Sequence, residues 1–171
     1  MISSWPHRLP ITPWRYKVPY SDVTLIFWYY GEMDTDAGRA ASQVLQNAIR
    51  GSMNPFRPQT PVPPWISEVV SEGDDNRRVR LEVGPVTDRR DPEKTLTYGL
   101  WTSALTGVKA FMEHYPSLSF MFEIQVTEFD DKDGKEKSCL VGVGGLRVLL
   151  RSLHKTLQSG ELRGKQTRIK A

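Results

Sequence analysis

The sequence lacks most of what marks a disulfide-stabilised, metal-binding or cofactor-binding protein. Cys139 is the only cysteine among 171 residues, so neither an internal disulfide nor a cysteine-cluster metal site can form. Its apolar neighbours predict a buried, structural thiol rather than a nucleophile. The three histidines, His7, His114 and His154, do not approach metal-ligand spacing. We therefore predict no metal site and no cofactor.

Long apolar runs are also missing. The longest, Val23 to Tyr30, is interrupted by Thr24 and is far shorter than the ~20 residues of a membrane helix, so no membrane span is predicted. Residues 1–10 lack the continuous apolar stretch of a secretory signal. This predicts a cytoplasmic protein, or a secreted one if the true N-terminus is missing. Hydrophobic residues make up 39% of the chain and charged residues 25%, as expected of a soluble globular protein.

Positive charge is concentrated at the C-terminus. The formal net charge is +3, but the segment from Arg147 onward carries a balance of +6 and the rest of the chain −3. The basic residues of this segment are Arg147, Arg151, Lys155, Arg163, Lys165, Arg168 and Lys170. Clustered Lys and Arg can bind phosphates, but no nucleic-acid recognition motif accompanies them. The sequence therefore favours a solvated tail, and nucleic acid is the less favoured partner.

The chain divides into three parts. Residues 1–20 contain four prolines among Trp5, Trp14, Tyr16 and Tyr20, which predicts an extended arm anchored by aromatic side chains. Residues 21–145 contain the periodic segments of a single α+β domain. Residues 146–171 form a basic extension, whose spaced leucines predict that it is partly helical.

Hydrophobic periodicity predicts two helices and five strands. Both alternating sets of residues 23–30 are apolar, as expected of a central strand covered on both faces. Apolar residues three and four apart predict one helix that starts near Asp34 or Thr35 and ends at Gly51, and a second between Thr97 and Pro116. Hairpins are predicted for residues 65–70 with 78–83, and for 118–126 with 138–143.

The resulting order, β-α-β-β-α-β-β, predicts a two-layer α+β sandwich of the ferredoxin-like or split β-α-β type. It has a mainly antiparallel sheet with both helices on one face. If the helices cover the side that bears Phe120 and Phe122, four apolar side chains point to the other side: Ile26, Trp28, Tyr30 and Met121. An uncovered patch of this kind is unusual on a monomer. We expect it to be covered by the N-terminal arm or terminal helix, by a second copy of the chain, or by a ligand.

A glycine-rich segment follows the last predicted strand. Gly142, Gly144 and Gly145, with Arg147 just beyond, are candidates for anion binding, because glycine-rich turns before a helix expose backbone N–H groups. The residues that complete a phosphate-binding motif are absent. Glycines at the end of an edge strand are the alternative, and the one that the sequence favours.

Part of the chain resembles a group of small, uncharacterised fungal α+β proteins. The resemblance rests on Thr97-Tyr-Gly-Leu-Trp-Thr-Ser-Ala-Leu-Thr-Gly-Val-Lys-Ala-Phe111, on the strand from Leu118 to Ile124, and on Gly142-Val-Gly144. It covers mainly residues 95–145. It implies an α+β fold and supplies no catalytic residues.

These observations favour a non-catalytic binding or accessory protein. Its aromatic sheet face would engage a protein partner, a second copy in a homodimer, or a small apolar ligand. One alternative is a small enzyme or accessory protein of a fungal natural-product pathway that uses the sheet as a pocket. Another is nucleic-acid binding through the basic tail.

Overall fold

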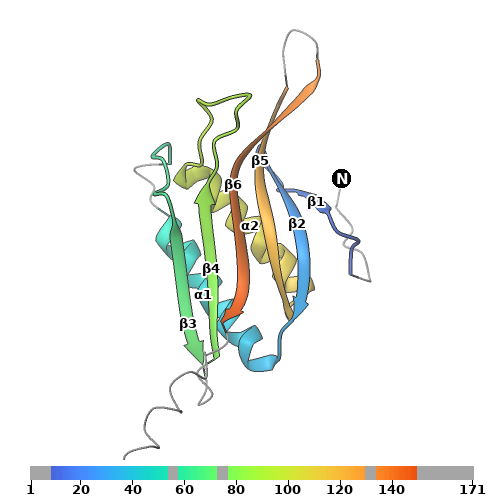
Figure 1. Ribbon diagram of the computed structural model, residues 1–171, viewed down its shortest axis with the longest axis vertical. Helices are drawn as coiled ribbons and strands as arrows, with labels where there is room; N and C mark the ends of the chain where they lie inside the picture. Colours follow the sequence, from blue (N-terminus) through green and yellow to red (C-terminus); the bar gives the residue numbers. More distant parts are fainter. Residues whose placement is uncertain (1–8, 54–57, 73–76, 130–133, 150–171) are drawn as a thin grey trace, which may run out of the picture.

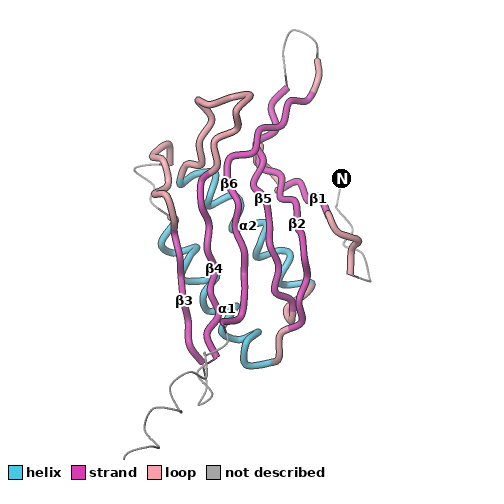
Figure 2. Tube along the Cα trace, in the orientation of Figure 1, coloured by secondary structure: helices cyan, strands magenta, loops and turns pink. Residues whose placement is uncertain are grey.

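A computed structural model describes residues 9–53, 58–72, 77–129 and 134–149, which form one six-stranded sheet and two helices (Figures 1 and 2). In chain order the elements are β1 (Trp14–Lys17), β2 (Val23–Glu32), α1 (Thr35–Ser52), β3 (Ile66–Glu72), β4 (Arg77–Pro85), α2 (Tyr98–His114), β5 (Leu118–Phe129) and β6 (Glu136–Leu149). The predicted helices and hairpins are present. β1 is an additional strand, formed by part of the segment that the sequence presents as an arm.

All neighbouring strands are antiparallel, in the order β1-β2-β5-β6-β4-β3. The two-layer α+β architecture is therefore confirmed. β4, α2 and β5 form a split β-α-β unit, because only β6 lies between the two strands that α2 connects. The ferredoxin-like order is not confirmed, since three strands separate β2 from β3. The reason is that the β5–β6 hairpin inserts between β2 and β4 and pairs with both.

Both helices lie on the same side of the sheet, behind it in Figure 1. α1 packs over β3 and β4, and α2 packs over β2 and against α1. α1 begins at Asp34, whose carboxylate accepts a hydrogen bond from the Ala37 N–H at 2.9 Å. Gly107 lets α2 approach β2, since a Cβ there would lie 2.7 Å from Leu25. The two described helices thus cover one face of the sheet, and neither of them covers the other face.

The core between sheet and helices is rich in aromatic rings. Phe27 of β2 stacks on Phe111 of α2 with ring centroids 4.2 Å apart, and Phe120 meets both rings edge-on. Trp14 of β1 also packs on Phe27 and Phe111, so its side chain lies on the helix side. β1 itself extends the edge of the sheet. The described part of the N-terminal arm therefore does not cover the opposite side of the sheet, which was one of the three expectations.

The two borders of the sheet differ. β1 has four residues between Pro13 and Pro19, and proline and short length both limit pairing at an edge. β3 has seven residues in continuous register with β4 alone. β2 pairs with β1 on one side and β5 on the other, so it is an interior strand as predicted.

β6 is longer than predicted. It continues to Leu149, so the expectation of a helix starting at Leu146 is wrong for residues 146–149. The continued pairing with β4 accounts for this, because Arg78 to Leu81 provide partners for the whole segment. The remainder of the basic extension, residues 150–171, lies outside the described residues. Neither described helix is long and apolar enough to span a bilayer.

Candidate binding face

The side of the sheet opposite the helices carries the residues that alternate with the core side chains. We call it the open face. Across β2, β5, β6 and β4 it is formed by Thr24, Ile26, Trp28, Ser119, Met121, Glu123, Gln125, Val143, Gly145, Arg147, Arg78, Arg80, Glu82 and Gly84. No described helix lies over it (Figure 1).

Three of the four predicted binding-face residues meet on the open face. Trp28 is the register partner of Met121, and Ile26 lies two residues earlier on the same side of β2. Trp28 and Ile26 are half-buried, whereas Met121 is 54% exposed. Trp28, Met121 and Ile26 therefore form an apolar patch, with Val143 of β6 beside it.

The fourth predicted residue, Tyr30, does not lie on the open face, so that prediction is wrong. β2 contains an irregularity between Trp28 and Gly31, where the register with β5 shifts by one residue. Strict alternation fails there, and the Tyr30 ring stacks on Phe111 with centroids 5.8 Å apart, on the helix side. Burial, with a smaller contribution from Tyr115, raises the pKa of Tyr30 to about 12. Tyr30 is therefore a core residue and not part of the open face.

The apolar patch contains a hollow of about 300 Å³ lined by Trp28, Met121, Phe122, Glu123 and Val143. The indole Nε1 of Trp28 is buried and has no hydrogen-bond partner among the described residues. The Glu123 carboxylate accepts a hydrogen bond from the Gln125 amide at 3.4 Å. This hollow offers apolar surface and one carboxylate.

A second aromatic residue, Trp65, lies on the same face and was not predicted. It directly precedes β3 and is 66% exposed. Three atoms of its six-membered ring lie 3.0–3.1 Å from where a Cβ of Gly84 would be, so the indole lies flat on the Gly84 backbone. One side of the ring therefore contacts the sheet and the other faces solvent. The signal in the sequence was Gly84, since a glycine within a strand often marks close approach by another group.

The charges of the open face are mostly positive. β1 contributes Arg15 and Lys17, which pair in register with Ile26 and Thr24. Together with the three arginines of β4 and β6 they make five cationic side chains against three carboxylates: Arg15, Lys17, Arg78, Arg80, Arg147, Glu82, Glu123 and Glu136.

Two of these three arginines share one carboxylate, Glu82. Arg80 and Arg147 are direct cross-strand partners. Glu82 forms an ion pair with each of them, at 3.7 Å from Arg80 and by a short contact with Arg147. The Nε of Arg80 is buried without a hydrogen-bond partner in the described structure. Like charges opposite one another destabilise a sheet unless an anion lies between them, so this corner is suited to a further negative group.

The predicted glycine-rich anion site is not formed. Gly142, Gly144 and Gly145 lie inside β6 rather than in a turn before a helix. A Cβ at Gly144 would lie 2.5 Å from the Phe122 ring, and one at Gly142 would lie 3.0 Å from Leu96. These two glycines are explained by packing against large core side chains. Arg147, the fourth candidate, lies on the open face beside Glu82.

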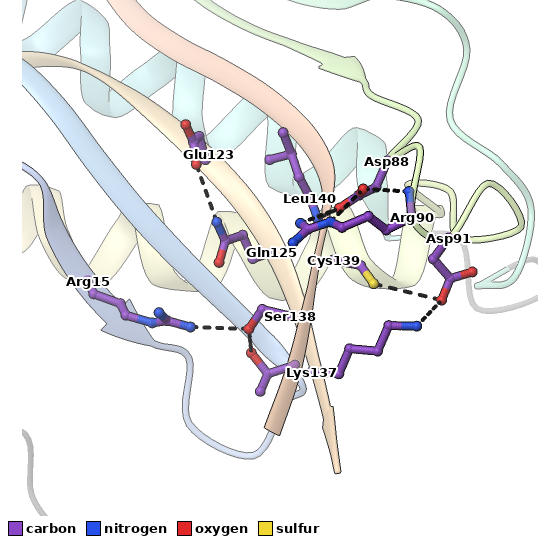
Figure 3. Close-up of polar contacts among 11 residues, drawn as sticks. Arg15, Asp88, Arg90, Asp91, Glu123, Gln125, Lys137, Ser138, Cys139 and Leu140 are labelled. Carbon is purple, nitrogen blue, oxygen red and sulfur yellow. Dashed lines mark hydrogen bonds and ion pairs between the residues drawn. The ribbon is translucent and has the colours of Figure 1, made fainter. Parts of the chain in front are cut away.

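A polar cluster at one end of the sheet fixes the loop that follows β4 (Figure 3). The Asp88 carboxylate accepts hydrogen bonds from Arg90 Nε at 3.1 Å and Nη2 at 2.7 Å, and from the Leu140 N–H at 3.4 Å. The hydrogen bonds from Arg90 hold the pKa of the Asp88 carboxyl well below its usual range. Its side chain is 8% exposed, so this carboxylate ties the loop to β6.

Cys139 lies next to this cluster. Its Sγ is 3.7 Å from Asp91 Oδ2, which also contacts the Lys137 ammonium at 3.4 Å (Figure 3). Burial first, and then the charge of Asp91, raise the pKa of the Cys139 thiol. A raised pKa disfavours the thiolate, so the prediction of a buried, structural cysteine agrees with its surroundings.

Comparison with protein-family models, with curated proteins and with solved structures finds no match for this chain.

Proposed function

We propose that this chain is a non-catalytic binding protein that engages another molecule through its open face, with Trp28 and Met121 at the centre of the contact. The observation that carries the proposal is the position of this patch. Both described helices lie on the opposite side of the sheet, and β1, the strand of the described N-terminal arm, extends the edge of the sheet. Among the described residues, no helix or arm segment covers the aromatic and apolar side chains of the open face.

The residue types of this patch suit binding. Tryptophan and methionine are enriched at the centres of protein interfaces, and a few such residues supply most of the binding energy. Fully burying a side chain the size of methionine contributes about 1.5–3 kcal/mol, and Met121 is 54% exposed before any partner binds.

The surroundings of the hollow favour binding over catalysis. Glu123, the carboxylate in the lining, hydrogen-bonds to an amide rather than to a base or nucleophile. The buried Cys139 and Asp88 serve packing and loop attachment instead. The contact would therefore depend on shape and apolar area more than on an activated group.

The test compares two methionines that are similarly exposed on opposite parts of the molecule. Met121 lies on the open face and Met53, which is 63% exposed, follows α1. Met121→Gln and Met53→Gln remove the same apolar group without adding charge, and Trp28→Ala removes the larger anchor. Each full-length variant is tested against single-stranded oligonucleotides, phage-displayed peptides, and itself by sedimentation velocity.

We expect at least one of these to bind the wild type. That interaction should weaken several-fold in Met121→Gln and tenfold or more in Trp28→Ala, with no change in Met53→Gln. Circular dichroism and thermal unfolding confirm that each variant is folded. The proposal fails if nothing in the panel binds, or if binding is equally strong in Met121→Gln and wild type.

A further inference from the structure

The flat indole of Trp65 and the arginines of β4 and β6 lie on the same face of the sheet. We infer that the ligand of the open face is a single-stranded nucleic acid, whose bases stack on Trp65 and whose phosphates bind the arginines. This inference rests on the proposed function, because it names the class of molecule that the open face binds. It is carried by the position of the Trp65 ring and by the charge distribution.

The first step is the stacking surface. Single-stranded nucleic acids bind sheets that present aromatic rings, because every base has a flat π-face. The Trp65 ring lies against Gly84, where any side chain would lift it from the sheet, and its other side is open to solvent. A base can therefore stack on Trp65 without any movement of the protein.

The second step is charge. From Gly84 back along β4, the open-face positions are Glu82, Arg80 and Arg78, each about 7 Å from the next. Arg147 lies directly opposite Arg80. Arg80 and Arg147 both contact the Glu82 carboxylate, which offsets only one of their two positive charges. A phosphate between the two arginines would relieve the repulsion between them that remains.

The basic extension adds to the same field. β6 ends at Leu149, in register with Arg78, and residues 150–171 carry six basic side chains against Glu161. A positive segment tethered to a positive face increases the local concentration of a polyanion. From the sequence, the basic extension is interpreted as a solvated tail, because no nucleic-acid recognition motif accompanies it. The open face supplies a stacking surface, which the sequence did not show.

A single strand suits this face better than a duplex or an acidic peptide. Bases in a duplex are stacked on one another and cannot reach a ring that lies flat on a sheet. An acidic peptide can pair with the arginines, but it has no flat group that makes use of the solvent-facing side of Trp65. A single-stranded oligonucleotide uses both features together.

The test is fluorescence anisotropy of labelled single-stranded RNA and DNA of mixed sequence, titrated with the full-length protein at several salt concentrations. Trp65→Ala should weaken binding about tenfold or more, and Trp65→Phe should recover part of it, because a smaller ring still stacks. Arg78→Gln and Arg147→Gln should each reduce the salt dependence of log K by about 0.7. Arg50→Gln, an exposed arginine of α1, is the matched control and should change neither quantity.

Competitors and a tail variant decide between alternatives. Duplex DNA, a polyglutamate peptide and a neutral oligosaccharide should all compete less well than the single strand. The inference is overturned if oligonucleotides do not bind, or if Trp65→Ala binds them as wild type does. It is also overturned if replacing Arg163, Lys165, Arg168 and Lys170 by Gln abolishes binding while Trp65→Ala has no effect. If a peptide or oligosaccharide binds in a Trp65- and Met121-dependent way and nucleic acid does not, the inference fails and the proposed function stands.

Discussion

Two adjacent glycines of β6 allow a direct test of how closely the sheet packs against its core. Gly144 faces the helices and Gly145 faces the open side. A Cβ at Gly144 would lie 2.5 Å from the Phe122 ring and 2.6 Å from the Glu82 carbonyl oxygen. A Cβ at Gly145 would meet the Phe120 carbonyl oxygen at 3.3 Å and Met121 Cγ at 3.6 Å. The same substitution thus adds one methyl group to a filled site and to a less crowded one.

The expected magnitudes follow from these distances. Carbon atoms in good contact are about 3.5–4.0 Å apart, so the Phe122 ring and the β4 backbone must each move by about 1 Å to admit Gly144→Ala. Overpacking of this kind costs about 1–3 kcal/mol, and because one partner is backbone we expect about 2–3 kcal/mol. Gly145→Ala should be within about 1 kcal/mol of wild type, since the lower entropy of the unfolded alanine chain offsets the mild contact.

Thermal and urea unfolding, followed by circular dichroism, measure this difference. For a chain of this size 1 kcal/mol corresponds to about 2–4 °C, so the Tm of Gly144→Ala should fall by about 4–12 °C. Gly145→Ala serves as the control for the loss of a glycine in the same strand. Equal Tm values for the two variants would refute the assignment of these residues to opposite faces.

Three further substitutions test particular contacts. Tyr30→Phe should leave the free energy of unfolding in urea unchanged or raise it by about 1 kcal/mol, because the buried hydroxyl has no described partner. Burial raises the Tyr30 pKa to about 12, so the wild type should also lose stability above pH ~10, whereas Tyr30→Phe should not show this loss. Asp88→Asn should lower the urea midpoint at neutral pH. Because the folded-state pKa of Asp88 is depressed, the difference in urea midpoint between variant and wild type should become smaller as the pH falls below about 4. A difference that does not change with pH would contradict this account. Asp34→Ala should cost about 1 kcal/mol through loss of the α1 cap, measured by thermal unfolding, whereas an unchanged Tm would show that the cap is not needed.

Local features of the fold were predictable because they depend on neighbouring residues. Alternation and helical spacing identified both helices and the β3–β4 and β5–β6 hairpins. Asp34 and Thr97 cap the helices as their residue types indicate. The order of strands was not predictable in the same way. Whether β2 pairs with β4 or with β5 depends on where the last hairpin inserts, and that is a property of the whole sheet.

The candidate site could likewise be predicted from the sequence only in part. Alternation correctly placed Trp28 and Met121 on one face. It failed at Tyr30, because a single irregularity in β2 shifts the register after Trp28 and turns the ring toward Phe111. Trp65 was included in the predicted strand 65–70, but β3 begins at Ile66, and the position of the ring over Gly84 is what gives Trp65 a defined orientation.

The strand order also has a consequence for synthesis of the protein on the ribosome. β2 finds its second neighbour only when β5 is made, as Leu25 pairs with Ile124, and β4 finds its second neighbour only when β6 is made. Until the β5–β6 hairpin leaves the exit tunnel, the nascent chain holds two separate hydrogen-bonding edges with apolar side chains beside them. Contacts so distant in sequence form slowly, and exposed edges of this kind are where newly made chains aggregate. Translation that stops or slows before Phe129 therefore leaves two unjoined halves that depend on chaperones.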